Sequence, residues 1–198
     1  MSDSQEPMKK VGYFVLSLVF ATAISLDSLK ATTVIPPTFD ELVAQAEVIF
    51  QGVTTDVTSQ WVGEGAQRHI VSYVSFKVEE TLKGNPGQSY TIRMLGGTVD
   101  GETMGVSDAP KFKVGDKDIL FIQNNGSQFI PLVGIMHGRF HVKQDQAGQE
   151  IVTSNEEEPV KNLARLGRVE ETEPSANEAN LTAADFKAAV KSKVQAPQ

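Results

Sequence analysis

The chain has 198 residues, of which 40% are hydrophobic and 22% charged, with a formal net charge of −7 and no cysteine. This length and balance predict one globular domain with extensions and exclude a wholly disordered chain. The acidic charge argues against nucleic acid or an anionic membrane as the main partner, because both repel it. The lack of cysteine excludes disulfide scaffolds, thiolate metal sites and thiol catalysis.

The N-terminal segment has the pattern of an export signal. Lys9 and Lys10 precede a mostly apolar stretch at 11–26, which is shorter than the roughly 20 residues of a membrane-spanning helix. Cleavage is expected after Ala31, with Ala23 as the alternative exit and an uncleaved anchor as the competing interpretation. We therefore expect residues 1–31 to be a signal peptide. The protein would then be exported, periplasmic or secreted, with no stable membrane anchor after cleavage.

A short helix is predicted at 38–46, where Thr38 can cap the first turn and Glu41 completes a capping box. Period-two patterns follow it, and the clearest is the stretch 67–82, which has Ile70 and Phe76 on one face. A strand of this length has to bend, as strands do when they close a small barrel. Further strands are expected at 48–53 with a bulge at Gly52, and at 90–94, 119–122, 129–133, 138–142 and 151–152.

The connections add to this pattern. Residues 96–115 form a glycine-rich loop, and the segment 119–122 that follows is apolar on both faces, which is typical of a buried strand. The sequence Asn-Asn-Gly at 124–126 predicts a tight hairpin turn into 129–133. About six or seven short strands with helices only at the ends predict an all-β sandwich or barrel. The long bent strand favours an OB-like Greek-key small β-barrel over residues 32–154.

The composition changes after Ser154. Residues 155–180 are acidic and contain proline, so they are expected to form a largely solvated linker, although 160–166 could dock on the barrel. A C-terminal helix is predicted within 181–198, beginning at Thr182, with Phe186 and Val190 on one face. The apolar stripe of this helix is narrow, so packing on the barrel and binding to a partner both stay open.

Several short patterns resemble those of a known group of proteins. They are Phe39 with Leu42 and Val43, the run VEETLKG at 78–84, GGTV at 96–99 and GRF at 138–140. Together they resemble a family of uncharacterised bacterial exported proteins, whose pattern is similar to the OB-fold domain of tissue inhibitors of metalloproteinases and netrin modules. The resemblance implies an OB-type barrel over about residues 32–152. Those inhibitors chelate zinc through an N-terminal cysteine, which this chain lacks, so metalloprotease inhibition does not carry over.

Two groups of residues are candidates for binding. His137, Arg139, His141 and Lys143 alternate along a predicted strand and are expected to share one outward face. Their positive charge would favour an anion, such as a carboxylate, a phosphate or an acidic glycan, over a metal ion. The alternative is an ordinary solvated strand face. Trp61, expected in a loop, could stack on sugars or bases, or instead cover the open end of a core.

The catalytic signals are weak. The run GVSDA at 105–109 nearly spells a nucleophile elbow around Ser107, but it lacks the final glycine and Pro110 follows. No pattern predicts a metal site or a cofactor. We expect a non-enzymatic binding module for a protein, peptide or glycan of the cell envelope, with the loop 96–115 and the histidine-bearing face as its contact surface. A protease inhibitor acting by loop insertion and a hydrolase using Ser107 are the alternatives.

Overall fold

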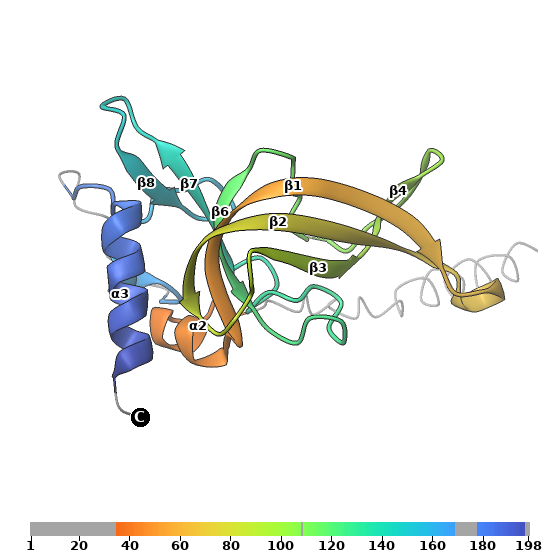
Figure 1. Cartoon of the computed structure of the whole chain (residues 1–198), viewed down its shortest axis with the longest axis horizontal. Helices are drawn as coiled ribbons and strands as arrows, with labels where there is room; N and C mark the ends of the chain where they lie inside the picture. The colour runs from red at the N-terminus through yellow and green to blue at the C-terminus, as the bar shows by residue number, and fades with distance from the viewer. Residues whose placement is uncertain (1–34, 108, 169–177, 197–198) are drawn as a thin grey trace, which may run out of the picture. The chain divides into compact units, whose positions relative to one another are not determined.

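The computed structural model describes residues 35–107, 109–168 and 178–196. Six antiparallel strands form the main sheet, in the order β3-β2-β1-β6-β7-β8, and a separate hairpin pairs β4 with β5 (Figure 1). The strands are β1 (Val48–Val62), β2 (His69–Lys83), β3 (Ser89–Leu95), β4 (Gly97–Val99), β5 (Glu102–Met104), β6 (Lys117–Ile122), β7 (Arg139–Gln144) and β8 (Glu150–Thr153). The helical segments are α2 (Phe39–Gln45), the 3₁₀ turns η1 (Gly65–Gln67) and η2 (Leu163–Arg165), and α3 (Ala183–Gln195).

The long curved hairpin of β1 and β2 is the largest feature of the sheet (Figure 1). The two strands pair along their whole length, and three shifts of register interrupt the ladder. One shift lies between Gln51 and Gly52, which confirms the bulge predicted there. A Cβ on Gly52 would lie 2.8 Å from the carbonyl oxygen of Lys77, so a larger residue would push the two strands apart. These bulges bend the hairpin, as the length of the predicted strand required.

Strand β6 separates two hydrophobic cores. Ile119 and Phe121 belong to the core that contains the two helices, whereas Leu120 and Ile122 belong to the core under β1, β2 and β3. All four side chains are fully buried. This confirms the prediction that the stretch is a buried strand, because only a strand covered on both faces gains from apolar residues at every position.

The two helices pack together on one side of the sheet. Helix α2 has the predicted capping box, in which Thr38 Oγ1 accepts from the Glu41 amide and the Glu41 carboxylate accepts from the Thr38 amide. Helix α3 begins after Thr182, as predicted. Its Phe186 is fully buried, with its ring centroid 5.9 Å from that of Phe39 and 4.9 Å from that of Phe140. The C-terminal helix therefore completes the core of this domain.

The closed barrel predicted from the sequence is not formed by strand pairing among the described residues, since β3 and β8 remain the two edges of the sheet. The stretch 129–133, predicted as a strand, makes only one bridge, between Leu132 and Ile122. Its neighbourhood still covers the edge of β3, where the Leu95 amide donates to the Phe129 carbonyl at 2.7 Å. An irregular segment thus lies where a closing strand was expected.

The predicted linker is partly integrated into the domain. Val160 is buried, its amide donates to the Val152 carbonyl and its carbonyl accepts from the Leu181 amide, so the predicted docking of 160–166 is confirmed at this residue. The rest of that linker at 169–177 and the predicted signal peptide at 1–31 lie outside the described residues. No helix in the described part of the chain is long and apolar enough to cross a membrane.

Candidate functional site

A large groove lies between the main sheet and the segment that follows β3. We call this segment, residues 96–107 and 109–112, the covering loop, and we call the sheet face that carries Val74, Phe76 and Met94 the Phe76 face. The groove has a volume of about 950 Å³. Its lining residues are Val57, Ser59, Ser72, Val74, Met94, Leu95, Gly96, Gly97, Thr98, Thr103, Met104, Gly105, Val106, Ser107, Ala109, Pro110, Lys111 and Phe112.

The covering loop crosses the Phe76 face at a point that requires glycine. The Ser72 hydroxyl donates to the Gly96 carbonyl at 2.7 Å and lies 2.8 Å from the hydroxyl of Ser59. Gly97, at φ 141°, passes directly over both hydroxyls, and a Cβ on it would lie 2.4 Å from each. No side chain fits at that distance. The two serines and the glycine therefore fix where the chain leaves β3 and starts to roof the groove.

The covering loop contains a small hairpin that the sequence analysis missed. It was predicted as part of a glycine-rich loop, but Gly97–Val99 and Glu102–Met104 pair as β4 and β5. The turn between them is Asp100 at φ 52° and Gly101 at φ 82°, the left-handed pair that tight hairpin turns need. The Asp-Gly dipeptide was the signal that could have identified this hairpin.

The chemistry of the groove is apolar with scattered hydroxyls. Its walls carry Val57, Met94 and Phe112, and Val57 is 38% exposed although it is aliphatic. Among the lining residues, Lys111 is the one with an ionisable side chain, and no acidic residue is present. Such a lining suits an apolar ligand oriented by a few hydrogen bonds.

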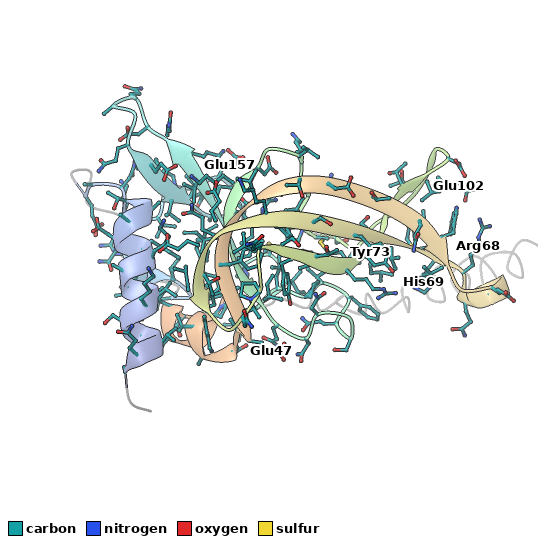
Figure 2. All side chains as sticks on the ribbon, viewed as in Figure 1. Glu47, Arg68, His69, Tyr73, Glu102 and Glu157 are labelled. Carbon is teal, nitrogen blue, oxygen red and sulfur yellow. The ribbon has the colours of Figure 1, made fainter. Side chains whose placement is uncertain are left out.

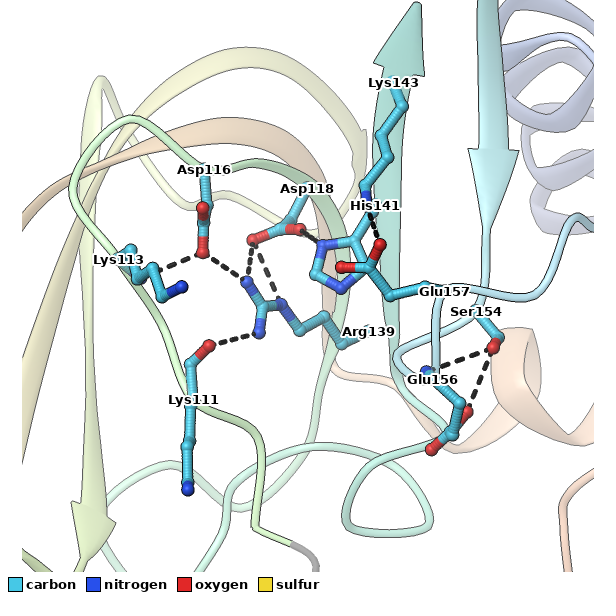
Figure 3. Close-up of polar contacts among 10 residues, drawn as sticks. All are labelled: Lys111, Lys113, Asp116, Asp118, Arg139, His141, Lys143, Ser154, Glu156 and Glu157. Atoms are coloured by element: carbon cyan, nitrogen blue, oxygen red, sulfur yellow. Dashed lines mark hydrogen bonds and ion pairs between the residues drawn. The ribbon is translucent and has the colours of Figure 1, made fainter. Parts of the chain in front are cut away.

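A second, polar cavity of about 530 Å³ adjoins the covering loop and shares Ala109 and Lys111 with the groove. Two of its lining residues, Arg139 and His141, contact the fully buried Asp118. One carboxylate oxygen of Asp118 accepts from Arg139 Nε at 3.1 Å and from Arg139 Nη2 at 2.9 Å, and the other lies 2.7 Å from His141 Nδ1 (Figure 3). Arg139 also donates a hydrogen bond from Nη2 to the Asp116 carboxylate and one from Nη1 to the Lys111 carbonyl, at 2.8 Å each. We call these residues the Asp118 cluster.

This cluster corrects the prediction of an outward cationic face. Arg139 is only 2% exposed, and its guanidinium also stacks at 4.0 Å on the ring of Phe112. Lys143 is paired with Glu157, and this hydrogen bond lowers the pKa of the Glu157 carboxyl. His137 precedes β7, is half-buried, and does not line either cavity. Burial lowers the pKa of its imidazole.

The predicted anion site therefore loses most of its donors. The Nε, Nη1 and Nη2 atoms of Arg139 all donate within the protein, and the charges of Arg139 and Lys143 face carboxylates. The sequence did contain a signal for this arrangement, because Asp118 directly precedes the apolar run 119–122 of a buried strand and a buried carboxylate needs a cationic partner. The part of the chain that the structure describes contains no group of three or more His, Asp or Glu side chains that could hold a metal ion.

Trp61 lies within β1 rather than in a loop, paired opposite Ile70. The Arg68 guanidinium stacks 4.0 Å from the centroid of its ring. The loop prediction was wrong because the strand continues to Val62 and the glycines at 63 and 65 form only the turn beyond it. Trp61 lines neither cavity, and Figure 2 shows Arg68 and His69 at the end of the hairpin remote from Glu157. The structure thus separates Trp61 from the other predicted site residues.

Ser107 lies on the wall of the groove, in a stretch with no helix after it. A nucleophile elbow places its serine at a sharp turn from a strand into a helix, so the near-match in sequence does not have the corresponding structure. None of the described histidines lines the groove with it.

Comparison with known protein families finds no family model that matches this chain, and comparison with curated proteins finds no match either. Its function therefore has to be argued from the groove and the Asp118 cluster.

Proposed function

We propose that this chain is an exported, non-enzymatic binding module, and that the groove under the covering loop holds its partner, a protein, peptide or glycan of the cell envelope. The observation that carries the proposal is the groove itself. Its volume of about 950 Å³ lies at the upper end of the range typical of ligand sites. The apolar side chains of Val57, Met94 and Phe112 on its walls suit the apolar part of a ligand, which the hydroxyl groups of the lining can orient.

The Asp118 cluster supports this proposal as a structural anchor. Arg139 binds the carbonyl oxygen of Lys111 and stacks on Phe112, two consecutive residues of the covering loop. Asp118 of β6 in turn holds Arg139 of β7. A fully paired buried cluster of this kind specifies one arrangement of the groups it connects, so it fixes the wall of the groove to the sheet and pre-forms the site.

We further propose that the domain is an open relative of the OB-type small barrel. The long bent hairpin of β1 and β2 supports this. The segment 123–133 supports it as well, because it connects to β3 through Leu95 and to β6 through Phe121, where the Val133 amide donates to the Phe121 carbonyl at 3.0 Å. Barrels of this type bind ligands through the face of two neighbouring strands and the loops beside it, and the groove likewise lies between sheet residues and the covering loop.

The experiment is a pull-down by the full chain from an envelope extract of its own source, read by mass spectrometry, with a groove-filling variant. Gly105 lines the groove, and a Cβ on it meets no heavy atom within 4 Å, so Gly105→Phe adds a large ring at the groove wall without a clash at the Cβ. Ala147→Phe, on the exposed turn between β7 and β8, is the matched control. We expect partners that are enriched by the native chain and Ala147→Phe and lost with Gly105→Phe. Equal enrichment by all three proteins would overturn the proposal.

A further inference from the structure

The outer edge of β1 lacks a neighbouring strand over half of its length. Strand β6 pairs with β1 only from Val48 to Val53, and the Thr54 backbone makes the last two bonds, with Gly115 and Asp116. From Thr55 to Val62 the only ladder partner of β1 among the described residues is β2. The hairpin β4-β5 crosses the face nearby but belongs to a separate sheet. The backbone N–H and C=O groups of this stretch that point away from β2 therefore have no neighbouring strand to pair with.

This edge also lacks the usual protection against pairing. The stretch 55–62 reads TDVTSQWV, which contains no proline and no lysine, and its one charged residue is Asp56. Natural edge strands are commonly protected by lysine, proline or a bulge. Here the one bulge lies at the start of the stretch, between Thr54 and Asp56. The residues beyond it are mostly β-branched or aromatic, the types that favour an extended strand.

The free edge and the groove are parts of one surface. Val57 and Ser59 lie on the free part of β1, and both line the groove. Side chains alternate between the two faces of a sheet. A strand added beside β1 would therefore direct every second side chain toward the Phe76 face, into the groove, while its backbone bonds to the free edge.

We propose that the partner binds as an extended peptide segment that adds a strand to the edge of β1 at Thr55–Val62. Every second side chain of this segment is apolar and enters the groove. An acidic residue of the peptide lies beside the ammonium group of Lys111. In Figure 3 this side chain points away from Arg139 and Asp118, and no ion pair of Lys111 is found among the described residues. This inference rests on the proposed function and identifies the class of its ligand.

A second copy of the chain fits the edge less well than a foreign peptide. Edge-to-edge pairing of two β1 strands would offer Val57 and Ser59 of one copy to the groove of the other. Those side chains are small, and they already form part of the wall of their own groove. A groove of about 950 Å³ needs larger apolar groups to fill it.

The test begins with phage-displayed random peptides long enough to span Thr55–Val62, selected on the full chain. The best binder is then resynthesised with one backbone amide methylated at a time. Because a strand bonds its neighbour through every second residue, methylation at alternate positions should weaken binding about tenfold or more, and the positions between should tolerate it. Val57→Lys should abolish binding of the selected peptide, whereas Ile35→Lys, equally aliphatic and outside the groove, should leave it unchanged.

Three results would overturn the inference. They are the absence of any selected peptide, an even response to methylation along the peptide, or a dimer of the full chain in sedimentation that Val57→Lys dissolves. The proposed function fails by a different result, which is capture of envelope partners that Gly105→Phe does not affect. Loss of capture with Gly105→Phe together with an even methylation profile would keep the groove as the site and reject strand addition.

Discussion

The Asp118 cluster allows a quantitative test of how the covering loop is held. Asp118 is fully buried and Arg139 is 2% exposed, so replacing Asp118 by asparagine leaves a buried guanidinium without its main counter-ion. Breaking such a pair typically costs about 3–5 kcal/mol. Arg139 keeps Asp116 and the Lys111 carbonyl as acceptors. We therefore expect Asp118→Asn to lower the unfolding free energy by about 3 kcal/mol, at the lower end of that range.

The double variant Asp118→Asn with Arg139→Met separates pairing from burial. It removes both charges and keeps an apolar side chain against Phe112. The double variant should therefore lose less unfolding free energy than the two single variants together, and the difference, the coupling energy, should be about 2 kcal/mol. The assay is urea unfolding at neutral pH, monitored by far-ultraviolet circular dichroism. Variants are compared when the dependence of their unfolding free energy on urea concentration is the same as that of the native chain. Lys143→Met breaks the exposed pair with Glu157 and should have a much smaller effect. Losses of unfolding free energy below about 1 kcal/mol in each single variant, which simply add in the double variant, would contradict this prediction.

Three other substitutions test the core, the sheet and a surface ion pair. Phe186→Ala, which empties a fully buried site, should lower the unfolding free energy by about 3–5 kcal/mol, and unchanged urea unfolding would show that α3 does not complete the core. Gly138→Ala places a Cβ 2.8–2.9 Å from three backbone atoms and should lower the melting temperature, whereas an unchanged value would contradict the packing at this position. Hydrogen bonds from Lys187 and Lys191 lower the pKa of the Glu80 carboxyl, so the stabilisation from these bonds is present above the ordinary pKa and lost as pH falls through the lowered value. Glu80→Gln should therefore make the unfolding free energy fall less steeply as pH is lowered. An unchanged dependence of unfolding free energy on acidic pH would count against these ion pairs.

The elements defined by local chemistry were predictable from the sequence. The capping box of Thr38 and Glu41 gave the start of α2, alternation gave β2, and an apolar run gave β6. Each of these depends on residues within a few positions of one another. The start of α3 at Thr182 followed in the same way.

The parts that could not be predicted depend on contacts between distant segments. Alternation correctly placed Arg139 on the strand face opposite Phe140, but it could not show that Asp118 and the covering loop bury that face. The barrel was expected to close through a strand at 129–133, and that segment instead follows an irregular path, with the Phe129 carbonyl bonded to Leu95. The groove was not predictable at all, because it exists only where Gly97 carries the chain over Ser59 and Ser72.

The central claim is that the groove holds the partner, and site-specific photo-crosslinking tests it most directly. A benzophenone side chain at position 103, an exposed position that lines the groove, is compared with one at position 147, on an exposed turn, with the full chain in an envelope extract. We predict a discrete adduct from position 103 that disappears when Gly105→Phe is added, and none from position 147. Adducts of equal yield from both positions, or adducts that survive Gly105→Phe, would contradict it.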